Sequence, residues 1–167
     1  MEKVYIGLGS NLADPQAQVE HGLRALAALP ETRLLRRSRL YRSAPWGKLD
    51  QPEFVNAAAV VETTLTPRGL LDHLLAIERG AGRQRDGQRW GPRVLDLDVL
   101  LYAARVIDEP GLRLPHPHLA ERAFVLLPLA EIAPDLQVPG AGHIQALLER
   151  TDKSACLPLE PERPLIR

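Results

Sequence analysis

The sequence is short of cysteine, of net charge and of long apolar runs, and each shortage excludes a class of protein. Cys156 is the only cysteine among 167 residues, which excludes an intrachain disulfide and a cysteine-based metal cluster. Basic and acidic residues number 21 each, so no overall field attracts nucleic acid or an anionic membrane. No apolar run approaches the roughly 18 residues of a membrane span, and the first residues contain no cleavable apolar segment. We therefore expect a cytoplasmic protein without membrane or nucleic-acid partners.

The length of the chain fits one domain with a substantial core. We find no internal repeat and no low-complexity segment. The expected organisation is a single domain over residues 1–167, in which the proline-rich tail from about residue 151 has no assigned role.

Apolar periodicity and turn residues predict the order βαββαβ, followed by further short elements. Asp14-Pro15 and Thr66-Pro67 each combine an N-cap residue with a first-turn proline, so each is expected to begin a helix. The expected strands are one ending at Gly9 and others near 32–43, 54–65 and 94–101, with a hairpin at 108–111 and short helices near 119–132 and 143–150. This order is typical of an α+β ferredoxin-like sandwich, in which helices pack on one face of an antiparallel sheet. The fold alone leaves the function open.

Two carboxylates interrupt the apolar strand near 94–101. Because residues two apart share a face of a strand, Asp96 and Asp98 point one way with Val94 and Leu100, while Leu95, Leu97, Val99 and Leu101 point the other way. Two neighbouring carboxylates require compensation by arginine, a shared proton or a divalent cation, unless they lie on the solvent face of an edge strand.

An arginine-rich stretch immediately precedes these carboxylates. Residues 79–93 contain five arginines against one acid, which is a net charge of +4 within a neutral protein. Arginine offers a planar donor fork that suits phosphate, and Mg²⁺ prefers carboxylate, water and phosphate oxygens. A solvated basic surface is the alternative for this stretch alone, but the adjoining aspartates favour a site that handles phosphate.

Several other residues allow two interpretations. Glu78 lies beside the apolar stripe of its helix, either as a boundary residue or as a partner of the arginines. His116 lies between two prolines, as a loop surface residue or as a positioned hydrogen-bond donor. Phe54 and Phe124 are the only phenylalanines, and they either fill the core or stack on a flat ligand.

The chain also resembles a known family along most of its length. The strings that carry the resemblance are YIGLGSN, DQPEFVNAAA, IERGAGRQR, RWGPRVLDLDVLL and LPHPHLAERAFVLLPLAEIAP. They are similar, in order from about residue 3 to 150, to the 6-hydroxymethyl-7,8-dihydropterin pyrophosphokinases of folate biosynthesis. This resemblance implies a magnesium-dependent transfer of pyrophosphate from ATP to the pterin hydroxymethyl group, which leaves AMP. It also implies small-molecule substrates, and we expect a monomer.

The resemblance assigns roles by position in the matching strings. Asp96 and Asp98 correspond to the ligands of two magnesium ions, and Arg83 and Arg93 to catalytic arginines on a mobile loop. The positions that match the nucleotide side are Glu78, Arg85, Arg89, Trp90, His116 and Arg122. The positions that match the pterin side are Ser43, Ala44, Trp46, Phe54, Asn56 and Phe124.

The chain departs from the family pattern around the expected adenine and ribose contacts. Pro117 stands where tyrosine is frequent, and Leu75, Asp86 and Arg113 also differ from some relatives. A nucleic-acid-binding ferredoxin-like module is the main alternative, although the strand near 94–101 carries acids where such sheets need aromatic residues. An inactive scaffold is disfavoured because the matching site residues are all present.

Overall fold

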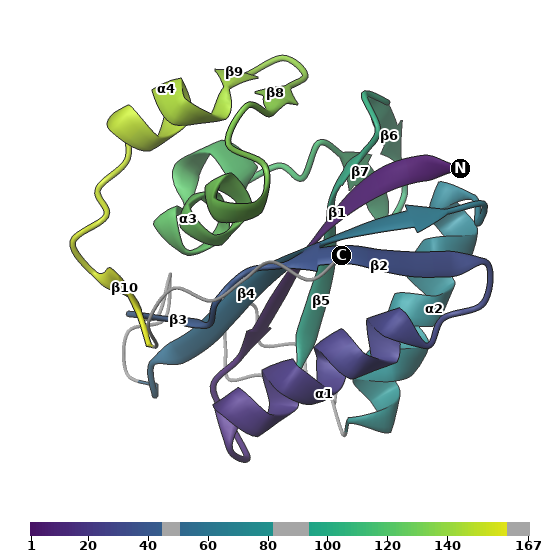
Figure 1. Ribbon diagram of the computed structural model, residues 1–167, viewed down its shortest axis with the longest axis horizontal. Helices are drawn as coiled ribbons and strands as arrows, with labels where there is room; N and C mark the ends of the chain where they lie inside the picture. Colours follow the sequence, from purple (N-terminus) through teal and green to yellow (C-terminus); the bar gives the residue numbers. More distant parts are fainter. Residues whose placement is uncertain (45–50, 82–93, 160–167) are drawn as a thin grey trace.

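The computed structural model describes residues 1–44, 51–81 and 94–159 of the chain (Figure 1). The helices are α1 (Pro15–Ala27), α2 (Pro67–Gly80), a 3-10 helix (Leu119–Glu121), α3 (Ala123–Ile132) and α4 (Ile144–Glu149). The strands are β1 (Glu2–Ser10), β2 (Thr32–Arg37), β3 (Tyr41–Ser43), β4 (Phe54–Thr63), β5 (Asp96–Tyr102), β6 (Ile107–Glu109), β7 (Leu112–Leu114), β8 (Gln137–Val138), β9 (Gly142–His143) and β10 (Cys156–Pro158).

The main sheet is antiparallel and has the order β10-β3-β4-β1-β5, with β2 also paired to β4. The first and third strands of the βαββαβ unit, β1 and β4, lie at its centre, which is the interleaved arrangement of a ferredoxin-like sandwich. The predicted fold class is therefore confirmed. The predicted hairpin is the β6–β7 pair.

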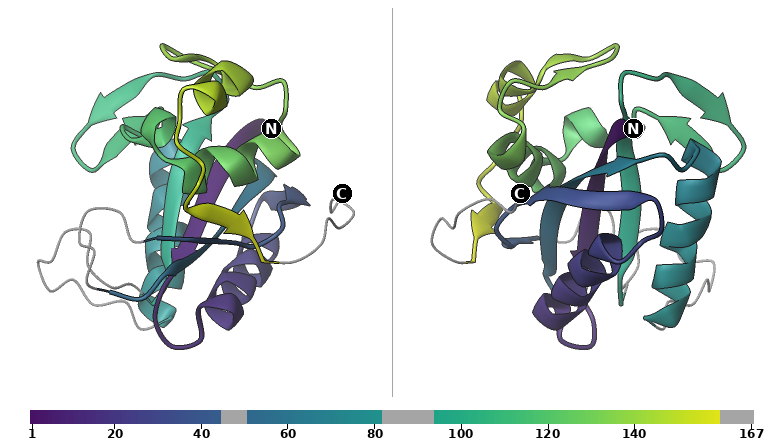
Figure 2. Two further views of the ribbon diagram at one scale, coloured as in Figure 1. Left: turned by 90° about the vertical axis from the view of Figure 1, so that its left-hand side faces the viewer. Right: turned by 45° about the vertical axis from the view of Figure 1, so that its right-hand side comes forward.

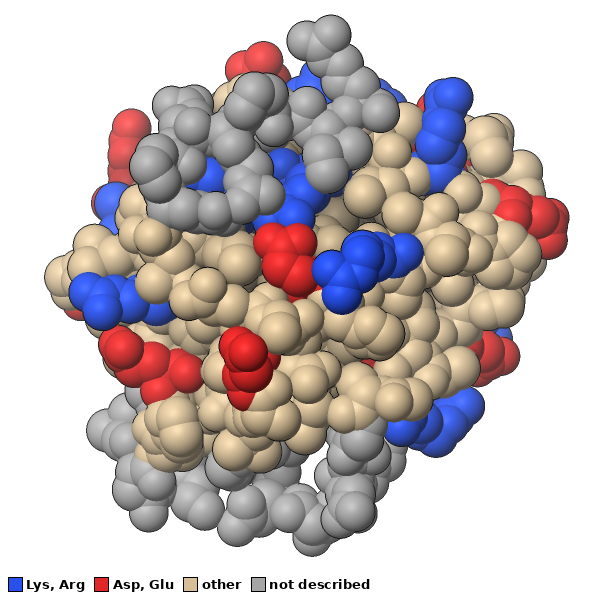
Figure 3. Space-filling model, turned by 60° about the horizontal axis from the view of Figure 1, so that its bottom comes forward, with Lys and Arg blue, Asp and Glu red and all other residues tan. Residues whose placement is uncertain are grey.

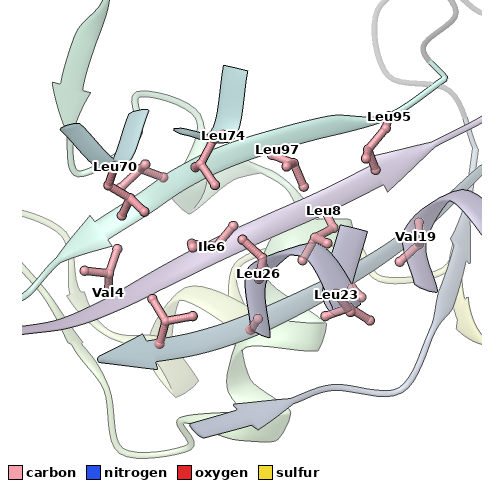
Figure 4. Close-up of a cluster of buried hydrophobic side chains, with 14 of the residues drawn as sticks. Val4, Ile6, Leu8, Val19, Leu23, Leu26, Leu70, Leu74, Leu95 and Leu97 are labelled. Carbon is pink, nitrogen blue, oxygen red and sulfur yellow. The ribbon is translucent and has the colours of Figure 1, made fainter. Parts of the chain in front are cut away.

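Helices cover both faces of this sheet rather than the one face that the element order suggested (Figures 1 and 2). α1 and α2 pack on one face, where Leu23, Leu26, Leu70 and Leu74 meet Ile6 in a buried cluster (Figure 4). α3 and α4 cover the other face, in a second cluster that contains Ala58, Val60 and Leu100. The elements that follow the βαββαβ unit therefore supply the second layer.

Local capping explains where the two long helices begin. Asp14 accepts the N–H of Ala17 at 3.4 Å, and Thr66 accepts the N–H of Gly69 at 3.0 Å. In each helix a proline occupies the first turn, where its missing N–H costs no intrahelical bond. Both predicted starts are confirmed.

The strand expected over 32–43 is divided into β2 and β3. Between them, the backbone N–H of Ser38 donates to the carbonyl of Ala58, and the Ser38 hydroxyl accepts the N–H of Ala58, both at 2.9 Å. A serine side chain thus satisfies the β4 backbone where a continuous ladder would have done so. The alternation of apolar residues does not indicate that a side-chain hydrogen bond replaces a backbone one at this point.

The register of β5 also differs from strict alternation. Tyr5 pairs with Leu101 and Ile6 with Val99, so Leu100 is an extra residue in the ladder. As a result Leu100 and Leu101 both join the cluster under α3, whereas Leu101 was expected on the opposite face with Leu95. The bulge lies beyond Asp98 and leaves the alternation from Leu95 to Val99 unchanged.

The tail contributes a strand to the main sheet. β10 pairs with β3, in the register Cys156↔Ser43 and Pro158↔Tyr41. It therefore covers the edge of β3 that would otherwise expose unpaired backbone groups. Within the described ranges, no helix has the length and apolar character that a membrane span requires.

Candidate active site

A cavity of about 630 Å³ lies on the α3 face of the sheet, where β1 ends and β4 and β5 begin. Its walls come from these strands, from α2, from the β6–β7 hairpin and from the segment that leads into α3. The lining includes Gly7, Gly9, Phe54, Asn56, Leu71, Leu75, Glu78, Asp96, Asp98, Arg113, His116, Pro117, Arg122 and Phe124. One cavity thus brings together residues that are far apart in the sequence, from the end of β1 to the start of α3.

The floor of the cavity is bare backbone because two glycines of β1 face it. A Cβ on Gly9 would lie 2.9 Å from Nδ2 of Asn56, which is closer than two such atoms can approach. Gly7 lies next to it on the same face, opposite Asp98 in the ladder. No role in the site was predicted for these glycines. Their spacing of two residues could have indicated that both lie on one face of the strand and leave that face without side chains.

Asp96 and Asp98 both line the cavity, as their spacing in β5 requires. Both are half-buried, and 40% of the Asp98 side chain is exposed. β5 is an edge strand of the sheet, as the alternative of two solvated acids on an edge strand requires. The two acids nevertheless face a cavity and not open solvent. Figure 3 views the molecule from this end, where acidic side chains lie at the centre of the face beside basic ones.

Glu78 supports the strand that carries the two aspartates. Its side chain is buried, and Oε2 accepts the backbone N–H of Leu97 at 2.7 Å. Leu97 lies between Asp96 and Asp98, and its own side chain points into the core under α1 and α2. Glu78 is therefore a buried hydrogen-bond acceptor for an edge strand and not a surface residue at the boundary of the helix.

His116 is a positioned side chain rather than a loop surface residue. It follows the cis Leu114–Pro115 bond, and its backbone N–H donates to the carbonyl of Leu100 at 2.9 Å. Nδ1 accepts the N–H of His118 at 3.2 Å, so the neutral ring carries its proton on Nε2, which lies 4.0 Å from Oδ2 of Asp98.

The surroundings of His116 keep the imidazole neutral. Burial, together with the nearby Arg122 and His118, lowers its pKa to about 4, against the opposing effect of Asp96. At neutral pH the ring therefore presents an N–H donor to the cavity without a positive charge.

Across β1 from the aspartates, an aromatic ring and an amide of β4 line the cavity, and a second aromatic ring comes from α3. Phe54 on β4 and Phe124 at the start of α3 are both half-buried lining residues. Asn56 lies on the same face of β4 as Phe54, and its Oδ1 accepts the Ser43 hydroxyl at 2.7 Å. The Arg122 guanidinium lies 5.4 Å from the centre of the Phe124 ring and is buried beside it.

Two residues expected near the pterin, Ser43 and Ala44, make hydrogen bonds outside the cavity. Ser43 does not line the cavity but fixes the Asn56 amide through its hydroxyl. The backbone N–H of Ala44 donates to the carbonyl of Ala155, next to β10. The tail thereby extends its pairing to the segment that follows β3.

Several expected residues lie outside the described part of the chain: Trp46, Arg83, Arg85, Asp86, Arg89, Trp90 and Arg93. Arg68 and Asp72 also line the cavity from α2, and sequence reasoning missed both. Arg68 pairs with Glu109 of the β6–β7 hairpin at 2.7 Å, a long-range contact that no local motif signals.

The donor set of the cavity fits Mg²⁺ rather than a cation held entirely by protein. No group of three potential His, Cys, Asp or Glu ligands occurs among the residues that the structure describes. Mg²⁺ commonly binds through one or two carboxylates and completes its octahedron with waters and substrate phosphates. The pair of half-buried aspartates in a roomy cavity meets that requirement.

Comparisons with known sequences show which family the chain is similar to. A family model described as 7,8-dihydro-6-hydroxymethylpterin-pyrophosphokinase (HPPK) matches residues 5–134. The 2-amino-4-hydroxy-6-hydroxymethyldihydropteridine pyrophosphokinase of Pseudomonas aeruginosa is 53% identical over 148 residues, which cover 89% of this chain and 91% of that protein. The enzyme of the same name from Haemophilus influenzae is 44% identical over 161 residues, covering 96% of this chain and all of that protein.

Solved structures share the fold. A crystal structure of Plasmodium falciparum HPPK-DHPS with SDX-DHP has a TM-score of 0.67 over 90% of this chain, at 14% sequence identity. An HPPK-DHPS structure in complex with substrates has a TM-score of 0.71 over 89% of this chain, at 13% identity. The present chain spans 43% of each of those longer chains, so this likeness concerns the fold alone. By its sequence, over most of its length, the chain belongs to the family of 7,8-dihydro-6-hydroxymethylpterin pyrophosphokinases.

Proposed function

We propose that the cavity is the active site in which this protein transfers the pyrophosphoryl group of ATP to the hydroxymethyl oxygen of 6-hydroxymethyl-7,8-dihydropterin. The products are AMP and the pterin diphosphate, a step of folate biosynthesis. One observation carries the assignment. One cavity is lined by a carboxylate pair on β5 and, across β1, by Phe54 and Asn56 of β4, with Phe124 also in its wall, and it thus offers a phosphate end and a ring end.

At the phosphate end, Asp96 and Asp98 would hold two magnesium ions. A bound Mg²⁺ neutralises charge on the phosphate oxygens and lowers the pKa of a nearby alcohol. The residues of the chain have a different task, since phosphoryl-type transfer requires in-line positioning more than covalent chemistry. The hydrogen bond from Leu97 to Glu78 supports this proposal because it fixes the backbone between the two aspartates.

Cationic and neutral donors surround the same end. His116 would donate from Nε2 to a phosphate oxygen, because its Nδ1 is already an acceptor. Arg122 contributes a positive charge from a buried position beside Phe124, and this charge also acts on His116. Arg83 and Arg93 are proposed to reach the phosphates and to exclude water, while Arg85, Arg89 and Trp90 complete the nucleotide side.

At the ring end, the flat pterin would lie between Phe54 and Phe124. Two phenyl faces bury both sides of a heteroaromatic ring, and such stacking stabilises the complex beyond the effect of the buried apolar area. Asn56 would hydrogen-bond the polar edge of the ring, with its amide held by Ser43. Ala44 and Trp46 are proposed to border the same end.

The test is a product analysis. The protein is incubated with ATP, Mg²⁺ and 6-hydroxymethyl-7,8-dihydropterin, and the nucleotide product is identified. The expected product is AMP in equal amount to the pterin diphosphate, with no transfer when EDTA removes the metal. Formation of ADP, or transfer that persists in EDTA, would contradict the assignment.

We also propose that the protein is a cytoplasmic monomer with a single domain. Its small-molecule substrates and its single cysteine support a reducing, ATP-containing compartment. Size-exclusion chromatography with light scattering tests the oligomeric state, for which a mass near 18.5 kDa is expected.

A further inference from the structure

Three hydrogen bonds converge on the carboxylate of Glu131, near the end of α3. Oε2 accepts the backbone N–H of Arg39 at 2.9 Å, and Oε1 accepts the Nε–H of Arg39 at 3.1 Å. Oε1 also accepts the Tyr41 hydroxyl at 2.5 Å. All three donors belong to β3 or to the residues just before it, so one side chain ties α3 to this strand.

This contact of Glu131 with Arg39 and Tyr41, here called the tie, is largely shielded from water. The Glu131 side chain is 11% exposed and that of Arg39 is 21% exposed, while Tyr41 is buried. Burial and the bond to Glu131 raise the pKa of Tyr41, so its phenol remains a donor at all ordinary pH values. A charge-assisted contact of this kind is much stronger than an exposed ion pair.

On the strand side, the tie adjoins the ring end of the cavity, because β3 pairs with the part of β4 that carries Phe54 and Asn56. Tyr41 is opposite Asn56 in the β3–β4 ladder, and Ser43 is opposite Phe54. Because Tyr41 and Ser43 are two residues apart, they share a face of β3. The strand that Glu131 holds is thus the strand that supports Asn56.

On the helix side, the tie is linked to the second aromatic wall. Glu131 follows Phe124 by seven residues, which is two turns, so both lie on the same face of α3. Between them, Pro128 has no N–H to donate to the carbonyl of Phe124, four residues earlier. The first turn of α3 therefore lacks one internal bond, and its position depends more on external contacts.

We propose that Glu131, through Arg39 and Tyr41, is a positioning residue for pterin recognition. It sets the separation between α3 and the β3–β4 pair, and hence the gap between Phe124 and Phe54. This inference rests on the proposed function, in which the ring stacks between the two phenylalanines. A ring with good contacts on both faces needs phenyl planes about 7 Å apart, twice the optimal carbon–carbon distance.

Substitution of Glu131 by Gln tests the inference. The amide keeps the size of the side chain but presents an NH₂ group to one of the three donors, so at least one bond is lost. Tyr41→Phe removes the phenol bond to Glu131 and a longer bond that the phenol accepts from Arg39 at 3.4 Å, but it keeps the carboxylate, and it serves as the milder variant. The readouts are the KM for the pterin, the KM for ATP, kcat and the midpoint of thermal unfolding.

The sequence offers a matched control. Glu20 on α1 pairs with Arg37 at 2.7 Å, on the opposite face of the sheet and away from the cavity. Glu20→Gln therefore makes the same chemical change at another carboxylate that ties a helix to the β2–β3 segment. It controls for a general loss of stability.

The expected result is a selective loss of pterin recognition. The KM for the pterin rises about tenfold in Glu131→Gln, as expected for loss of one bond to a charged group, and about threefold in Tyr41→Phe, which keeps both bonds from Arg39 to the carboxylate. The KM for ATP and kcat change less than about twofold, since Asp96 and Asp98 lie on β5 and Glu78 on α2, and among the described residues proposed for the nucleotide side only Arg122 adjoins α3. Glu20→Gln leaves both KM values unchanged.

Two outcomes overturn the inference: an unchanged pterin KM in both variants, or equal rises in the pterin and ATP values. A similar pterin effect in Glu20→Gln would also overturn it. If Glu131→Gln fails to fold, Tyr41→Phe alone decides the matter by the same comparison. Failure of the proposed function is distinct, because then the wild-type protein itself would form no AMP with the pterin.

Discussion

Oε2 of Glu78 lies 2.7 Å from the backbone nitrogen of Leu97, the residue that separates Asp96 from Asp98. β5 is at the edge of the sheet, so among the strands that the structure describes none lies beside it to receive this N–H. A buried carboxylate from α2 satisfies it and at the same time fixes the backbone from which both aspartates project. The geometry of the candidate metal ligands therefore depends on a residue of another element.

Replacement of Glu78 by Ala removes the acceptor of the Leu97 N–H. We expect the free energy of unfolding to fall by about 1–3 kcal/mol, the cost of leaving a buried donor unsatisfied. Transfer activity should fall as well, because the strand that carries both aspartates loses its support. Urea denaturation and the AMP assay measure the two effects.

Glu78→Gln is the matched variant for this prediction, since its amide oxygen still accepts the N–H of Leu97. It should retain more of the stability than Glu78→Ala. Equal unfolding free energies for Glu78→Ala and the wild type would contradict the supporting role.

Asp98→Ala should abolish pyrophosphoryl transfer while leaving the fold intact. The side chain is 40% exposed, so its removal costs little stability. Its loss removes half of the carboxylate pair. Initial rates at saturating Mg²⁺ and thermal unfolding provide the measurements.

Asp135→Ala, at an exposed acid beyond α3, is the control for that substitution. It should transfer at the wild-type rate. Near wild-type transfer by Asp98→Ala would show that the carboxylate pair is not the metal site.

Gly9→Ala should weaken pterin binding. The new Cβ would lie 2.9 Å from Nδ2 of Asn56, so the amide must move from the position that Ser43 fixes. We expect the KM for the pterin to rise by roughly tenfold, equivalent to the loss of about one good hydrogen bond. The KM for ATP should change little.

Gly80→Ala provides the contrast, because a Cβ at this last residue of α2 meets no atom within 4 Å. It should leave pterin binding unchanged and preserve or slightly raise the stability, as expected for alanine in a helix. An unchanged pterin KM in Gly9→Ala would refute the close packing between Gly9 and Asn56.

His116 should make the stability of the metal-free protein depend on pH. Its pKa is lowered to about 4 in the folded state, from 6.5 in an unfolded chain. Between these values the unfolded state binds more protons, so stability falls as the pH drops from 6.5 toward 4, by up to about 3 kcal/mol. Above pH 6.5 this contribution is constant.

Unfolding free energies of the wild type and His116→Asn, measured in EDTA at several pH values, test this dependence. The difference between the two proteins should shrink as the pH falls through that window. His21→Gln, at an exposed histidine of α1, should show the wild-type pH profile. A constant difference between wild type and His116→Asn would mean that His116 titrates alike in both states.

Local patterns in the sequence determined the elements and the orientation of the aspartates. Proline and capping residues marked the starts of α1 and α2. The alternation that begins at Leu95 and continues into β5 turned Leu95 and Leu97 into the core and Asp96 and Asp98 away from it. These features depend on neighbours within a few residues, which is the range over which periodicity and capping act. The resemblance to the pyrophosphokinases added the family, which the comparisons confirmed.

Only the tertiary structure decided which of these residues meet. The division of β2 from β3, the bulge at Leu100 and the second helical layer each depend on partners far along the chain, such as the contact of Ser38 with Ala58. The same holds for Glu78 beneath Leu97 and for Glu131 beside Tyr41, which are 19 and 90 residues apart in sequence. A buried carboxylate finds its donors by packing, and a one-dimensional pattern contains no measure of distance across the sheet.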